Sequence, residues 1–134
     1  MSYNHIFHHV GCLVDNLEES ILTYSNLLGF DPPSEIYDIS SQKVKVCFIK
    51  NTADSFIELV EPYEDNTSLR KMLKKGQSFY HTAYTVKNFD EALEEMESKG
   101  AKFMPVFTSE AFNNRRCVFL YTPELQLIEL IESA

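Results

Sequence analysis

Residues of the types that bind metal ions occur in the same order in each half of the chain, as one histidine followed by one glutamate. His9 and His81 are 72 positions apart, and Glu58 and Glu129 are 71 positions apart. Each histidine lies in a predicted strand, and each glutamate interrupts an otherwise apolar one. Two neutral imidazoles and two carboxylates form a ligand set for a divalent metal ion. The sequence therefore predicts a metal site, provided that the halves bring these four side chains together.

The positions of the histidines and glutamates follow from an internal repeat. Residues 7–20 are similar to residues 79–92, and residues 56–61 to residues 127–132. The repeat also pairs 44–49 with 116–121, which aligns Phe48 with Leu120. In each half, a strand is followed by a helix that begins near an asparagine and ends at a glycine. Three strands then follow, so each half predicts the order βαβββ.

This pattern predicts an α+β fold rather than a doubly wound parallel sheet, because short turns join three strands after each helix. We expect a single domain over residues 1–134, with modules at about 5–62 and 78–133 and a linker helix at about 66–76. A pseudo-two-fold axis would relate the modules, and their mixed, curved sheets would form a metal-binding cleft. The second strand of the first module is expected at about 31–36.

Composition excludes several classes of partner. The chain has 134 residues and a net charge of −8, which disfavours nucleic acid and anionic membrane surfaces. It has no apolar run long enough to cross a bilayer, and its first residues do not resemble a signal peptide. Three cysteines without a CxxC motif suit reduced, buried thiols. We therefore expect a cytoplasmic protein whose partner is a small molecule.

Simpler explanations for the four residues are also consistent with the sequence. A lone strand histidine is often a core or edge residue satisfied by a hydrogen bond. Glu58 and Glu129 would be ordinary polar residues if their sheet faces were exposed to solvent. If protein covers those faces, a carboxylate there costs several kcal/mol unless it is paired or bound to metal. The repeat favours the metal interpretation because both halves place the same two residue types at equivalent positions.

Nearly the whole chain resembles the vicinal oxygen chelate superfamily, and most closely its methylmalonyl-CoA epimerase and glyoxalase I (lactoylglutathione lyase) members. The motifs that carry the resemblance are His9-Val10-Gly11, Ile57-Glu58-Leu59-Val60-Glu61-Pro62, His81-Thr82-Ala83-Tyr84 and Leu127-Ile128-Glu129-Leu130. It implies that His9, Glu58, His81 and Glu129 bind the metal. His5 and His8 are competing imidazoles, but the family's ligand lies two residues before the glycine, which selects His9.

The resemblance implies a metal-dependent isomerase or lyase that transfers a proton alpha to a carbonyl, through a metal-stabilised enolate. Glu129 matches the family's glutamate that both binds metal and transfers the proton. The ion would be Ni, Co, Mn, Fe or Zn, since this ligand set does not select among them. The substrate would have adjacent oxygens, as a thioester or hemithioacetal has. A homodimer is expected, because pairing would cover the strand edges at the ends of the modules.

Other functions within the superfamily remain open. One is a different metal-dependent enzyme, such as a dioxygenase or an antibiotic-inactivating transferase, and another is a metal-free resistance protein that sequesters its ligand. The loop at 109–116 has no glycine where the epimerases usually have several, and no residue clearly matches the epimerases' second base. Tyr84 and Phe112 could line the cleft. An anionic substrate tail could contact basic residues, namely Lys71, Lys74, Lys75, Arg115 and Arg116.

Overall fold

The computed structural model describes residues 4–30, 33–51 and 53–134. The chain divides into two compact units. The N-terminal unit is His9–Tyr80, and the C-terminal unit joins the residues up to His8 with His81–Ala134. The division falls inside two strands, β1 (Ile6–Leu13) and β5 (Phe79–Val86).

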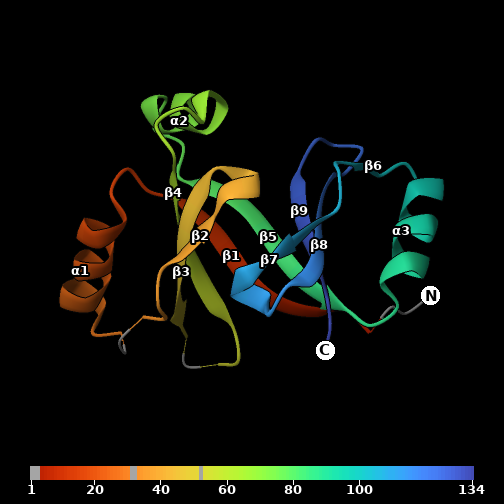
Figure 1. The fold of residues 1–134 in the computed structure, drawn as a ribbon, viewed down its shortest axis with the longest axis horizontal. Helices are drawn as coiled ribbons and strands as arrows, with labels where there is room; N and C mark the ends of the chain where they lie inside the picture. Colours follow the sequence, from red (N-terminus) through yellow and green to blue (C-terminus); the bar gives the residue numbers. More distant parts are fainter. Residues whose placement is uncertain (1–3, 31–32, 52) are drawn as a thin grey trace. The chain divides into compact units, whose positions relative to one another are not determined.

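The sheet of the N-terminal unit has the strand order β2-β3-β4-β1 (Figure 1). Strand β1 is parallel to β4, whereas β2 and β4 are both antiparallel to β3. A short 3-10 helix, η1, joins β2 to β3, and helix α2 follows β4. The elements after β1 are α1 (Leu17–Leu28), β2 (Tyr37–Ile39), η1 (Ser40–Gln42), β3 (Val44–Lys50), β4 (Phe56–Pro62) and α2 (Thr67–Lys74).

The C-terminal unit repeats this plan. Its strand order is β5-β9-β8-β6, and β7 also pairs with β8. Strand β5 is parallel to β9, and the other pairs are antiparallel. The elements after β5 are α3 (Phe89–Ser98), β6 (Lys102–Phe103), β7 (Phe107–Ser109), η2 (Glu110–Phe112), β8 (Arg115–Tyr121) and β9 (Leu127–Glu132).

The predicted α+β class with mixed sheets is confirmed, and two strand boundaries differ from the prediction. The second strand is Tyr37–Ile39; residues 33–36 form no strand, and 31–32 lie outside the described residues. The first of the three strands predicted after the second helix is divided into β6 and β7, with Pro105 between them. Proline has no backbone N–H to donate, so the ladder is interrupted there. The pseudo-two-fold relation stays a prediction.

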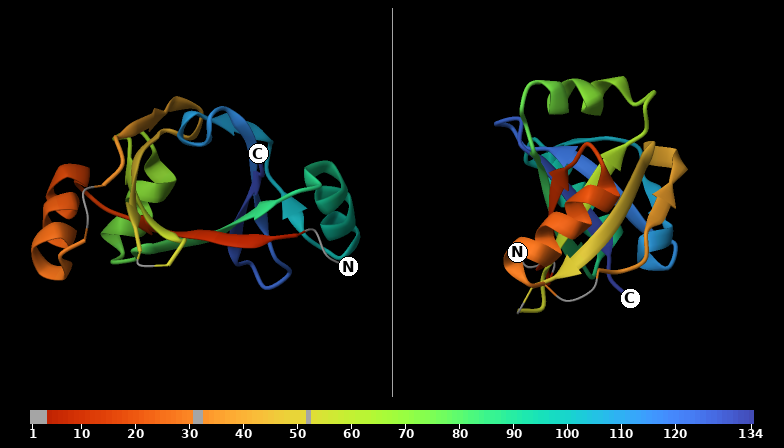
Figure 2. Two further views of the ribbon diagram at one scale, coloured as in Figure 1. Left: turned by 90° about the horizontal axis from the view of Figure 1, so that it is seen from below. Right: turned by 90° about the vertical axis from the view of Figure 1, so that its left-hand side faces the viewer.

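One face of the N-terminal sheet packs against α1, which contacts β3 and β4 (Figures 1 and 2). Cys47, Ile49 and Leu59 of this face are buried with Leu17 of the helix. Strand alternation places Val46, Phe48 and Glu58 on the opposite face. Glu58 therefore lies on the face that α1 does not cover.

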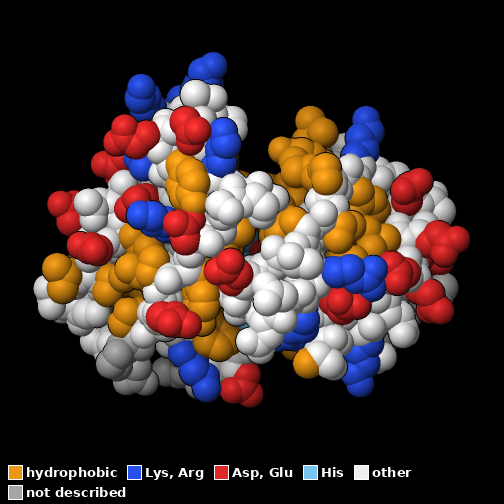
Figure 3. Space-filling model, in the orientation of Figure 1, with side chains coloured by type: hydrophobic (Ala, Val, Ile, Leu, Met, Phe, Trp, Pro, Cys, Tyr) orange, Lys and Arg blue, Asp and Glu red, His pale blue; other side chains and the backbone are white. Residues whose placement is uncertain are grey.

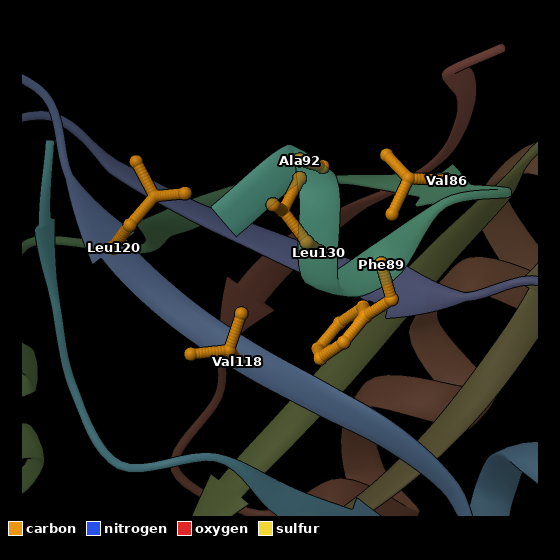
Figure 4. Packing of buried hydrophobic residues seen from close by; sticks show 6 residues of the cluster. All are labelled: Val86, Phe89, Ala92, Val118, Leu120 and Leu130. Atoms are coloured by element: carbon orange, nitrogen blue, oxygen red, sulfur yellow. The ribbon is translucent and has the colours of Figure 1, made fainter. Parts of the chain in front are cut away.

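The C-terminal sheet packs against α3 in the same way. Figure 4 shows Leu120, Val118 and Leu130 of the sheet with Phe89 and Ala92 of the helix. All five residues are at most 3% exposed. Alternation along β8 and β9 places Phe119 and Glu129 on the face away from α3. Each sheet thus packs one face against a helix and has a buried glutamate on the other.

Candidate metal centre

The N-terminal unit contains a close contact between His9 and Glu58. The His9 Nε2 lies 3.2 Å from the Glu58 Oε1. His9 is 0% exposed and Glu58 is 5% exposed. The pairing of β1 with β4 sets this contact, because Gly11 lies directly opposite Glu58 and His9 is two residues earlier on the same face.

The C-terminal unit contains the equivalent contact. The His81 Nε2 lies 3.2 Å from the Glu129 Oε1, and the two residues are 1% and 4% exposed. The residue opposite Glu129 in the parallel ladder is Ala83, again small, and His81 precedes it by two positions. Glutamate is rarely this buried unless it is paired. Both glutamates are therefore buried beside an imidazole, and neither is the solvent-facing polar residue of the simpler explanation.

The two contacts fit metal ligands in chemistry and in spacing. Each of the four residues offers one nitrogen or oxygen donor to a divalent ion. Two donors bound to one ion, each at about 2.1 Å, lie about 3.0 Å apart at a right angle and about 3.4 Å apart at a tetrahedral angle. The Nε2–Oε1 separation of 3.2 Å in each unit falls within this range. Each unit thus supplies half of the predicted ligand set in a suitable arrangement.

A phenylalanine accompanies each His–Glu contact, and the sequence did not identify this pair. Phe48 lies opposite Glu58 in the β3–β4 ladder, and Phe119 lies opposite Glu129 in the β8–β9 ladder. The sequence repeat aligned Phe48 with Leu120, which is wrong by one residue. The second turn is one residue longer: Asn113 and Asn114 both have positive φ, whereas at the first turn only Lys43 does.

The other histidines lie outside these pairs. The His5 ring contacts Tyr84 with centroids 6.1 Å apart, and the His8 ring contacts Phe112 with centroids 5.3 Å apart. Tyr84 also packs against the cluster beneath α3, so its cleft-lining role is not supported. The selection of His9 over His5 and His8 as the metal ligand stays a prediction.

The two arginines at the start of β8, Arg115 and Arg116, already bind other groups of the C-terminal unit, which disfavours them as contacts for an anionic substrate tail. Arg116 binds Asp90 through two nitrogens and Glu132 through its Nη2, and its guanidinium lies 4.7 Å from the Phe89 centroid. Arg115 donates to backbone carbonyl oxygens of Phe112 and Glu132. The remaining basic candidates are Lys71 and Lys74 of α2 and Lys75 at its C-cap. Basic side chains gather over α2 at the top of Figure 3.

The described cysteines are unsuited to nucleophilic or ligand roles. Cys47 and Cys117 are 0% exposed, and Cys12 is partly buried. Burial, with a smaller contribution from the Glu58 carboxylate, raises the pKa of Cys47 to about 11. The same causes raise the pKa of Cys12. A thiol with a raised pKa is mostly protonated at neutral pH and is a poor nucleophile.

A polar cavity of about 430 Å³ lies elsewhere in the N-terminal unit, lined by Asp15, Glu61 and Arg70 among others. Its arginine binds Asp15 and the carbonyl oxygen of Pro62, which fastens α2 to the end of β4. Glu61 accepts a hydrogen bond from the Leu17 N–H at the start of α1. The cavity contains neither His9 nor Glu58, and its Asp15, Glu61 and Arg70 already serve to join secondary-structure elements.

Membrane insertion has no support in the described helices: none of them combines the length and the apolar character that crossing a bilayer requires.

Comparison with known proteins identifies the family. Among curated relatives, the uncharacterised protein YqjC of Bacillus subtilis is 26% identical over 92% of this chain and 89% of its own. The mitochondrial methylmalonyl-CoA epimerase of Dictyostelium discoideum is 25% identical over 92% of this chain and 76% of its own. The crystal structure of methylmalonyl-CoA epimerase from Mycobacterium tuberculosis has the same fold, with a TM-score of 0.82 at 23% identity over 96% of this chain and 87% of its own. The family model described as Glyoxalase/Bleomycin resistance protein/Dioxygenase superfamily matches residues 8–119, and the chain therefore belongs to this superfamily.

Proposed function

We propose that His9, Glu58, His81 and Glu129 together bind one divalent metal ion per chain. The observation that carries this proposal is the presence of the same buried Nε2–Oε1 contact, at 3.2 Å, in each of two similar units. Burying a carboxylate in an apolar sheet is unfavourable unless the charge is compensated. A function that needs both carboxylates explains why each unit has one.

We further propose that the protein is an isomerase or lyase acting on a substrate with adjacent oxygens. The similarity to methylmalonyl-CoA epimerases supports a thioester, and a hemithioacetal has the same arrangement of oxygens. A bound divalent ion, whether Ni, Co, Mn, Fe or Zn, would supply Lewis-acid polarisation of the substrate carbonyl. That polarisation acidifies the neighbouring C–H.

Glu129 is the proposed catalytic residue. Its carboxylate would accept the proton from the carbon alpha to the carbonyl and return it to the product. Glu58 occupies the equivalent place in the other unit, which makes it the natural control. Glutamine at either position keeps an oxygen donor but removes the base.

The test is solvent-deuterium exchange at the alpha carbon, measured by mass spectrometry with methylmalonyl-CoA and with the methylglyoxal–glutathione hemithioacetal. Metal content is determined on the same samples. We expect wild-type exchange on one of these substrates, and a loss on the order of 10² or more in Glu129→Gln with metal retained. The matched Glu58→Gln variant should lose mainly metal affinity. Wild-type exchange in Glu129→Gln would place the base elsewhere.

The proposal includes the assembly and the location of the protein. We propose that both units form one domain and that the chain works as a homodimer in the cytoplasm. Strands β2 and β6 lie at the ends of the strand order, and pairing with a second copy would cover these edges. Light scattering at high protein concentration tests the dimer, and a strict monomer there would contradict it.

A further inference from the structure

In the N-terminal unit, Phe48 lies beside both residues of the His9–Glu58 pair. It is 7% exposed and lies opposite Glu58 on the neighbouring strand. Its ring meets the His9 imidazole edge to face, with centroids 5.3 Å apart and planes at 75°. Phe56 also packs edge to face on Phe48, at 6.0 Å and 82°. The imidazole is therefore in contact with an aromatic ring that is itself held in place.

In the C-terminal unit, Phe119 has the same position relative to His81 and Glu129. It is 6% exposed, lies opposite Glu129, and meets the His81 ring at 5.1 Å and 82°. Its support differs, because Phe107 stacks on it nearly parallel, at 5.7 Å and 16°. The ring contact with the histidine is thus similar in both units. The second aromatic residue, which packs on the phenylalanine, has a different orientation in each unit.

The orientation of the imidazole matters because a histidine can present either ring nitrogen. Rotation of the ring about its bond to Cβ exchanges the edges, and the torsion has broad preferences of its own. An edge-to-face aromatic contact favours one orientation by a specific geometry, beyond its burial of area. Outer residues that fix the ring orientation of a metal-binding histidine tune the affinity of the site.

We propose that Phe48 and Phe119 are positioning residues that hold His9 and His81 with Nε2 toward the glutamates. This inference rests on the proposed metal site. It assigns the two phenylalanines a role in metal affinity and ligand geometry, in addition to their contribution to packing. Leucine in their place would fill much of the volume and remove the aromatic contact.

The experiment measures Co²⁺ binding by calorimetry and records the visible absorption spectrum of the Co²⁺ protein, which reports ligand geometry. The variants are Phe48→Leu and Phe119→Leu. The control is Phe89→Leu. Phe89 is 2% exposed in the core beneath α3 and belongs to neither His–Glu pair. Thermal unfolding of all three variants measures the loss of packing.

We expect Phe48→Leu and Phe119→Leu each to weaken Co²⁺ binding tenfold to a hundredfold and to shift the spectrum. Phe89→Leu should lower the unfolding midpoint by a similar amount and keep the affinity within about twofold of wild type, since it removes packing and the ring contact with Arg116 but touches no proposed metal ligand. If Phe119→Leu does not fold, Phe119→Met replaces it in the same comparison.

Two outcomes would overturn the inference. The first is that both Phe48→Leu and Phe119→Leu keep the wild-type Co²⁺ affinity and the wild-type spectrum. The other is an equal loss of affinity in Phe89→Leu, which would show a general effect of stability. A wild-type protein that binds no Co²⁺ is a separate result, because it refutes the metal site of the proposed function and the positioning role along with it.

Discussion

In both units the His–Glu contact has the same arrangement on one face of the sheet. On the face that packs against a helix, equivalent residues make different interactions. Glu61 and Glu132 follow the buried glutamates at equivalent positions. Glu61 accepts a hydrogen bond from the Leu17 N–H at the start of α1, at 2.7 Å. Glu132 instead binds Arg116, at 2.8 Å. The same residue type therefore supports a helix N-terminus in one unit and an ion pair in the other.

On the face with the His–Glu contact, the residues of that contact and the adjoining phenylalanine do not diverge. Histidine, glutamate and phenylalanine have the same mutual arrangement in both units, with identical Nε2–Oε1 distances. Structural needs alone do not explain this agreement, because apolar residues in place of a buried ionic pair are often as stable. The comparison teaches that the helix-facing positions vary with local packing, and that the histidine, glutamate and phenylalanine shared on the opposite face are where a common function is expected.

The largest expected loss of stability comes from the two cores. Leu59 and Leu130 are equivalent, and both are at most 2% exposed. Changing either to alanine should lower the free energy of unfolding by about 2–5 kcal/mol, because it leaves a cavity beneath α1 or α3. Chemical denaturation measures each loss. A loss below about 1 kcal/mol for one of them would show that its unit is not packed as described.

A smaller effect should separate the two helix N-termini. The Asn16 side chain accepts the Glu19 N–H at 3.0 Å, whereas Asn88, its equivalent, makes no side-chain capping bond to α3. Asn16→Ala should therefore destabilise the protein by about 1 kcal/mol, and Asn88→Ala by less. Denaturation midpoints of the two variants give the comparison. Equal losses would contradict the difference between the caps.

The Arg116 cluster should make one unit sensitive to acid. Hydrogen bonds from Arg116 lower the pKa of Asp90 and of Glu132. Because these pKa values are lower in the folded state, the stabilisation is complete above the unfolded values, near about 4, and is lost as pH falls through the folded ones. The stability difference between wild type and Arg116→Gln should thus be largest at neutral pH and shrink below pH ~4. A difference that does not vary with pH would refute the linkage.

The smallest effect concerns a polar residue that only one unit buries. Ser109 is 1% exposed where the other unit has the buried residue Ile39, and no described residue accepts or donates a hydrogen bond at its hydroxyl. Ser109→Ala should leave the stability unchanged or raise it by up to about 1 kcal/mol. A clear loss in denaturant unfolding would mean that the hydroxyl has a partner, such as a buried water.

Much of the fold was predictable because the repeat and the strand alternation carry the information. The period of two along the strands placed Glu58 and Glu129 opposite the helix-packed residues, as observed. The position of β2 was not predictable, because three residues give too short a pattern. The positions of Phe48 and Phe119 opposite the glutamates were not predictable either. The second half has one additional residue with positive φ, Asn114, before β8, and this residue shifts the strand by one position relative to the first half.

The central claim is that the two His–Glu pairs share one ion, and metal stoichiometry tests it most directly. Metal content per chain is measured by mass spectrometry for wild type, His9→Ala and His81→Ala. A shared site predicts one ion per chain in wild type and a near-complete loss in each variant, although each variant retains one intact pair. Two ions per chain in wild type, or one retained at full stoichiometry in each variant, would show that the pairs act separately and would contradict the account.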